Sequence, residues 1–94
     1  MNFNTFQSTA AGQRQSEPDT LDFTTLRLTE EAGEVAGVVK RIARKQREDV
    51  SKTHMKKLKD EMGDVLHALS KLADAAGLSL EEIARQSLDK QAHD

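Results

Sequence analysis

The sequence has no cysteine, tryptophan or tyrosine and only three phenylalanines among its 94 residues. The missing cysteine excludes disulfide scaffolds and cysteine-ligated zinc sites, and it fits a reducing compartment. The scarcity of aromatic side chains argues against a stacking platform for nucleic-acid bases. No apolar run approaches the roughly 20 residues that cross a bilayer, and the first residues lack the pattern of a secretory signal. We therefore expect one small cytoplasmic domain over residues 1–94, with no membrane partner.

Charge is distributed unevenly along the chain, although the net charge at pH 7 is only −2. Residues 40–59 contain nine basic and two acidic residues, a local charge of +7, so the other residues together carry −9. A nucleic-acid surface would bring that acidic remainder against phosphates, and no recognition helix with base-reading Arg or Asn side chains stands out. We expect no nucleic-acid partner and a solvated surface for most of these cations.

Apolar residues recur with the 3.6-residue period of an α-helix in four segments, whereas the alternating patterns and hairpin turns of β-strands are missing. These stripes predict a short helix over 2–11, a long helix over 19–47, a second long helix that follows Ser51 or Thr53 and stops at Gly77, and a last helix over 80–91. Ser79 with Glu82 is a capping-box pattern at the start of that last helix. The sequence predicts an all-α fold.

The two long stripes predict an antiparallel helix hairpin that carries the catalytic helices over 19–91, while residues 1–17 form an N-terminal helix and linker ending near Pro18. Phe3, Phe6 and Ala10 share one side of the N-terminal helix, and we expect at least two of the three phenylalanines in the core. A chain this small cannot cover both sides of the hairpin. We therefore expect a four-helix core completed by dimerisation.

Two carboxylates lie within the apolar arcs of the long helices. On a wheel that advances about 100° per residue, Glu31 falls among the apolar positions of the first helix and Glu61 among those of the second. Each is followed three residues later by a flanking acid, Glu34 or Asp64. Such a cluster needs a compensating cation, because burial and mutual repulsion both disfavour the charges. Oxygen ligands without His or Cys indicate Mg²⁺, with Mn²⁺ as an alternative.

A competing interpretation treats these acids as ordinary helix carboxylates with salt bridges to Arg27, Lys40 or Lys71. The interior glycines Gly33, Gly37 and Gly63 lie at the same level and each disfavours the helix by about 1 kcal/mol relative to Ala. They suggest that a backbone or a ligand approaches closely near the acids, although surface glycines tolerated for no packing reason are an equal alternative.

The acidic residues form the pattern Glu30-Glu31-x-x-Glu34, 26 intervening residues, then Glu61-x-x-Asp64. With the segments EEAGEVAG and DEMGDVLHALSKLADAAGLSLEEIA, this pattern resembles the MazG-like nucleotide pyrophosphohydrolases over residues 21–90. The resemblance implies an all-α enzyme, a homodimer or dimer of dimers, that uses Mg²⁺. It implies cleavage of nucleoside triphosphates between the α and β phosphates, giving a monophosphate and pyrophosphate, as in housecleaning of nucleotide pools.

The resemblance also assigns roles by position. The residues at metal-binding positions are Glu31, Glu34, Glu61 and Asp64. Glu30 or Glu34 is the candidate catalytic base that deprotonates water. Lys90 matches a substrate-contacting Lys of the family, and Ser87 stands where an Asn is common. Lys57, one of four lysines between residues 52 and 59, is the candidate for a second phosphate contact.

Two further functions remain open at the level of sequence. Within the same superfamily, the substrate could be phosphoribosyl-ATP instead of a common nucleoside triphosphate. From a different class, a noncatalytic helical dimer could serve as a partner-binding module. The paired acids favour the enzyme over the binding module, and the choice of base or sugar leaves no signature in the sequence.

Overall fold

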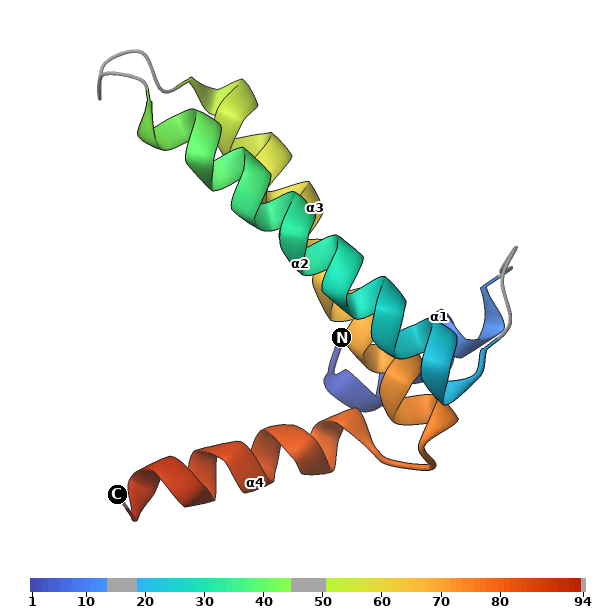
Figure 1. The fold of residues 1–94 in the computed structure, drawn as a ribbon. Coiled ribbons are helices and arrows are strands. Elements are labelled where there is room, and N and C mark those ends of the chain that lie inside the picture. Colours follow the sequence, from blue (N-terminus) through green and yellow to red (C-terminus); the bar gives the residue numbers. More distant parts are fainter. Residues whose placement is uncertain (14–18, 45–50, 94) are drawn as a thin grey trace.

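The computed structural model describes residues 1–13, 19–44 and 51–93, which form four helices: α1 (Phe3–Gly12), α2 (Leu21–Ala43), α3 (Lys52–Ala75) and α4 (Leu80–Ala92) (Figure 1). This described part of the chain contains no strand, so the predicted all-α class is confirmed. None of the helices in these ranges is long and apolar enough to span a membrane.

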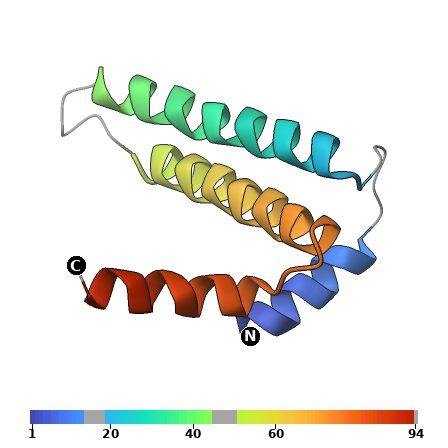
Figure 2. The ribbon, with the colours of Figure 1, turned by 60° about the horizontal axis from the view of Figure 1, so that its bottom comes forward.

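Helices α2 and α3 pack along their lengths as an antiparallel hairpin, the most extensive contact between helices in the structure (Figures 1 and 2). Thr20 caps α2, where its side chain accepts a hydrogen bond from Phe23 N–H at 3.3 Å. Ser51 caps α3 and forms a capping box with His54, whose Nδ1 accepts from Ser51 N–H at 3.1 Å. The predicted extension of α2 to Arg47 lies outside the described residues.

The turn between α3 and α4 follows the predicted signals. Gly77 adopts the left-handed conformation with φ +72°, which a residue without a Cβ adopts at no steric cost. Leu78 N–H donates to Ala73 C=O at 2.8 Å and closes the end of α3. Ser79 then caps α4 by accepting from Glu82 N–H at 3.2 Å. These local contacts confirm both the stop at Gly77 and the start at Leu80.

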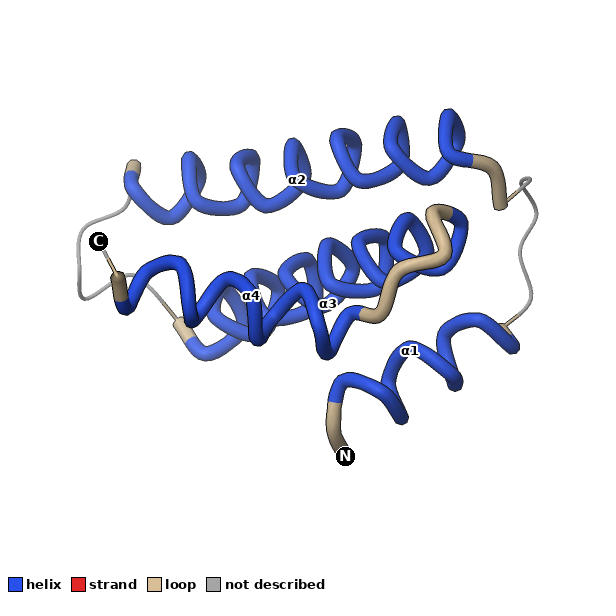
Figure 3. Tube along the Cα trace, turned by 90° about the horizontal axis from the view of Figure 1, so that it is seen from below, coloured by secondary structure: helices blue, strands red, loops and turns tan. Residues whose placement is uncertain are grey.

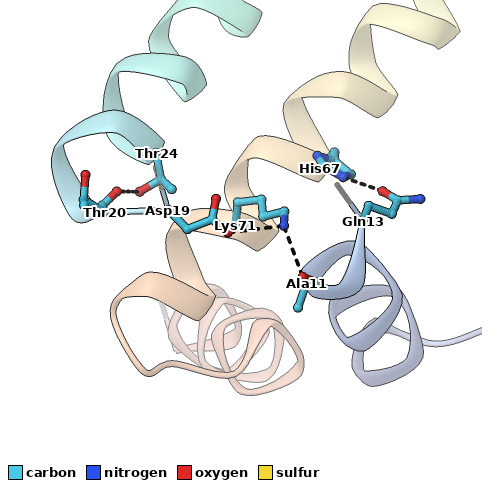
Figure 4. Close-up of polar contacts among 7 residues, drawn as sticks. All are labelled: Ala11, Gln13, Asp19, Thr20, Thr24, His67 and Lys71. Carbon is cyan, nitrogen blue, oxygen red and sulfur yellow. Dashed lines mark hydrogen bonds and ion pairs between the residues drawn. The ribbon is translucent and has the colours of Figure 1, made fainter. Parts of the chain in front are cut away.

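Helix α1 lies against the last turns of α3, and two polar contacts fix its end (Figure 4). The Lys71 side chain is 2% exposed, and its Nζ donates to Ala11 C=O at 3.4 Å and lies 3.6 Å from Asp19 Oδ2. His67 Nε2 lies 2.7 Å from Gln13 Oε1. Burial and the nearby Lys71 charge lower the pKa of His67 below 6.5, so the neutral imidazole is favoured in this contact.

One expectation about packing is wrong within the single chain, and a second, the close approach of a backbone or a ligand at the glycines, is tested only for the backbone. Phe3 and Phe23 are exposed and only Phe6 is half-buried, so fewer than two phenylalanines belong to the core. A Cβ added at Gly33 or Gly63 would meet no atom within 4 Å, so no neighbouring backbone explains these glycines. The buried apolar residues are instead small alanines together with Val38 and Leu80, and the other larger apolar side chains in the described part of the chain are half-buried or exposed.

We expect opposite effects of alanine at two glycines. Gly77→Ala should lower the free energy of unfolding by about 1 kcal/mol, because a Cβ is strained at positive φ. Gly33→Ala, in open space inside α2, should raise it by about 0.5–1 kcal/mol through helix propensity. Urea denaturation of both variants beside the parent measures the two changes. Destabilisation by Gly33→Ala would contradict the open space around that position.

Candidate metal centre

The antiparallel hairpin brings three of the predicted carboxylates to one level. One oxygen from each of Glu31, Glu61 and Asp64 lies within 4.8 Å of the others. Oxygen ligands around a Mg²⁺ ion, at about 2.1 Å from the metal, lie at most about 4.2 Å from each other. Small rotamer changes are therefore enough to turn this group into one face of a coordination sphere. All three donors are carboxylate oxygens, the chemistry that Mg²⁺ and Mn²⁺ prefer.

The three carboxylates differ in their access to water. Glu61 is buried, Glu31 is half-buried and Asp64 is exposed, so the group opens from the helix contact toward solvent. Burial raises the pKa of the Glu31 carboxyl above its usual value of 4.5, and the charge of Asp64 raises it further. The charge of Arg27 opposes this shift. The folded chain thus disfavours the negative charge on Glu31, and a cation bound among the three acids would favour it.

A lysine one turn away supplies part of the missing positive charge. Lys57 Nζ lies 3.0 Å from Glu61 Oε1, and the lysine side chain is 57% exposed. The hydrogen bond to Glu61 and the attraction of its charge raise the pKa of Lys57. The competing interpretation had named Lys71 as a partner of the acids, whereas Lys71 pairs with Asp19 at the other end of α3. The ammonium of Lys57 therefore contacts a carboxylate oxygen of Glu61 that a metal ion bound at the cluster would also use.

Of the other predicted site residues, two lie on α2 next to the three carboxylates and two lie on α4, away from them. Glu34 is exposed and is not one of the three clustered carboxylates, but its charge contributes to the raised pKa of both Glu31 and Lys57. Glu30 is exposed next to Glu31. Ser87 and Lys90 are exposed on α4. This helix follows the C-terminal end of α3 and makes its main contact with α1 (Figure 1). Within one chain, the structure does not bring Ser87 and Lys90 to the carboxylates.

The ion pair of Lys57 with Glu61 competes with the phosphate contact for which Lys57 was the candidate. Residues four apart on a helix are neighbours, so the i,i+4 spacing already allowed this ion pair. The ion pair and the phosphate contact use the same ammonium group, so they exclude each other at any one moment.

All-helical proteins in which carboxylates converge across antiparallel helices include a class that holds metal ions between the helices. The MazG nucleotide pyrophosphohydrolase domain matches residues 19–93 of the sequence, and the chain belongs to this family. No similar sequence was found among curated proteins.

A solved structure supports the same fold. The crystal structure of iMazG from Vibrio DAT 722, described as Ntag-iMazG, is similar with a TM-score of 0.69 and 23% sequence identity. The similarity covers 98% of this chain and 97% of the other. At this identity the similarity establishes the MazG fold for all four helices, including α1, which lies outside the family match.

We expect Glu31→Gln to stabilise the cation-free protein at pH 7. The raised pKa means that the folded state binds a proton at Glu31 more tightly than the unfolded chain does. The charge on Glu31 therefore destabilises the fold above its folded pKa, and this penalty disappears as the pH falls below about 4.5. The variant's gain in free energy of unfolding should be present at pH 7 and absent at pH 4.

Chemical denaturation at both pH values, with chelator present, measures this difference. Glu30→Gln is the matched control, since Glu30 is exposed and lies outside the cluster; it removes only a minor repulsion of Glu31, so its gain at pH 7 should be much smaller. A stability gain from Glu31→Gln that is equal at pH 7 and pH 4 would contradict the proposed charge repulsion.

Proposed function

We propose that this protein is a nucleoside triphosphate pyrophosphohydrolase that requires Mg²⁺, with Mn²⁺ as a substitute, and releases a nucleoside monophosphate and pyrophosphate. The observation that supports this most directly is the convergence of Glu31, Glu61 and Asp64 from two helices, inside the region matched by the MazG family. The proposed setting is the nucleotide pool of the cytoplasm, in line with the absence of cysteine.

Each carboxylate has a distinct part in this proposal. The proposed metal ligands are Glu31, Glu61, Asp64 and, after a rotamer change, Glu34. A bound divalent cation would supply charge neutralisation for the phosphates, which is the main requirement of phosphoanhydride hydrolysis. Glu30 or Glu34, both exposed beside the cluster, would take the proton from the attacking water. Glu61 would serve as an anchor, because its buried side chain is the least able to reach substrate.

Positive groups would hold the substrate's charge. The Lys57 ammonium lies beside the cluster and is largely exposed, so it can turn from Glu61 to a phosphate once a metal ion takes its place. Lys90 would bind a phosphate from the exposed side of α4, with Ser87 one turn before it on the same helix. The long, flexible side chains of Lys57 and Lys90 can reach a phosphate in this way, and each loses side-chain entropy when it does so.

The hydrolysis products test the proposal. With Mg²⁺ and a panel of ribo- and deoxynucleoside triphosphates, we expect pyrophosphate and a monophosphate in equal amounts, and no turnover with chelator. Phosphoribosyl-ATP belongs in the panel, since the same cleavage applies to it. Release of orthophosphate and a diphosphate, or no turnover of any member of the panel, would contradict the assignment.

Substitutions of two neighbouring acids on α3, Glu61 and Asp60, distinguish loss of the metal site from a general effect of removing a negative charge. Glu61→Gln should abolish turnover and reduce the rise in melting temperature that Mg²⁺ gives the parent, because metal binding to the folded state is the source of that rise. Its stability without metal should stay within about 1 kcal/mol, since it loses the partly exposed ion pair with Lys57 and relieves repulsion. Asp60→Asn is the control, because Asp60 is exposed and paired with Lys56 outside the cluster.

We also propose that the protein is a homodimer or a dimer of dimers. The chain exposes 7179 Å² of surface, about a third more than the roughly 5,400 Å² expected for a compact monomer of 10.4 kDa. Ala32, Val35, Met62 and Val65 line an apolar groove of about 290 Å³ between α2 and α3. Met62 at its edge is 56% exposed, which leaves a large side chain for a second copy to cover.

Sedimentation equilibrium at micromolar concentration measures the mass of the assembly, and we expect a multiple of 10.4 kDa. Met62→Glu should shift the population toward monomer, because the partner would have to bury an unpaired charge. Lys59→Glu, an exposed change of charge on the same helix, is the matched control and should leave the assembly intact. A compact monomer of normal stability in the parent would rule out the dimer.

A further inference from the structure

The direction of α4 depends on few contacts. Helix α4 makes its main contact with α1, not with the hairpin that carries the carboxylates. Figure 2 shows α4 starting beside α1 and running away from it toward the C-terminus, and Figure 3 shows the connecting segment between α3 and α4. The proposed substrate residues Ser87 and Lys90 lie in the second half of α4, so a small rotation at its start moves them by several ångströms relative to the carboxylates.

One side chain of α1 forms two hydrogen bonds with the backbone where α4 begins. Gln7 Nε2 donates to Leu78 C=O at 2.9 Å, and Gln7 Oε1 accepts from Leu80 N–H at 2.8 Å. Leu80 is the first residue of α4, and its N–H is one of the four at a helix start that lack a partner inside the helix. The amide group of Gln7 thus pairs with the backbone on both sides of Ser79.

This two-point contact restrains the dihedral angles that aim α4. The carbonyl of Leu78 and the N–H of Leu80 flank Ser79, which has extended backbone angles of φ −96° and ψ 127°. Both groups point toward one amide only while Ser79 keeps this conformation. On the other side, Leu78 N–H is bonded to Ala73 C=O, so the angles of Leu78 are restrained as well. The chain between α3 and α4 therefore has no free hinge while Gln7 is in place.

We infer that Gln7 is a positioning residue that sets the direction of α4 and, through it, the distance of Ser87 and Lys90 from the carboxylate cluster. The consequence for substrate binding depends on the function proposed above, whereas the effect on α4 does not. Gln7 is partly buried and some 70 residues from its partners in sequence. Those partners follow the end of α3, which lies about 20 Å along the helix axis from Glu61 at 1.5 Å per residue. Gln7 is expected to affect substrate affinity and not the chemical step.

The absence of cysteine allows a direct measurement of the direction of α4. Spin labels at Lys40→Cys on α2 and Gln91→Cys on α4, both exposed positions, report one distance across the molecule. Labelled protein is diluted into unlabelled protein so that distances within one chain dominate. We expect a single narrow distribution in the parent and a broad one in Gln7→Ala. Ser8→Ala, the next residue of α1 and exposed, should keep the narrow distribution.

Steady-state kinetics gives the second readout. Gln7→Ala should raise KM about three- to tenfold, the effect of one or two lost hydrogen bonds, with kcat within about twofold. Gln7→Glu keeps the acceptor for Leu80 N–H and lacks the donor for Leu78 C=O, so it should fall between parent and Gln7→Ala. In a Lys90→Ala background, Gln7→Ala should add little, because both changes act through the same contact.

The outcomes separate the two proposals. A distance distribution that stays narrow in Gln7→Ala would overturn the positioning role whatever the activity, as would a loss of kcat at unchanged KM. If the parent hydrolyses none of the triphosphates, the proposed function fails. The broadening measured by the spin labels then still decides whether Gln7 holds α4.

Discussion

The packing of α2 against α3 is the contact on which the rest of the structure depends. It sets Glu31 and the pair Glu61 and Asp64 at one level on facing helices. A helix places residues three and four apart on one side, so a shift of one helix by a turn would separate these carboxylates by about 5 Å. The same apolar contact that builds the core thus fixes the geometry of the candidate site.

Local signals and wheel positions were enough to predict the hairpin and most of the cluster. Ser51, Gly77 and Ser79 mark helix ends through contacts with residues at most a few positions away, which sequence patterns capture well. The convergence of Glu31 with Glu61 required only that two apolar arcs face each other. Periodicity determines such arcs, because burial follows the side of the helix and not the individual residue.

Contacts between distant segments were not predictable in the same way. Gln7 and Lys71 are ordinary polar residues whose partners lie more than 50 positions away, and nothing in their spacing marks those partners. At least two of the three phenylalanines were expected in the core, whereas Phe3 and Phe23 are both exposed in the single chain. Large apolar residues favour burial, but a surface also contains many of them, so the residue type alone does not determine the outcome.

The ion pair between Lys57 and Glu61 bears on the order of folding and metal loading. In proteins whose fold depends on a metal, the ligands have no other stabilising partner and the apo chain unfolds. Here the most buried acid already has a partner from its own helix, and the helix contact extends well beyond the level of the cluster. The chain can therefore fold during synthesis without waiting for a divalent cation. Under the proposed function, the cell's supply of that cation would then control activity more than the amount of folded protein.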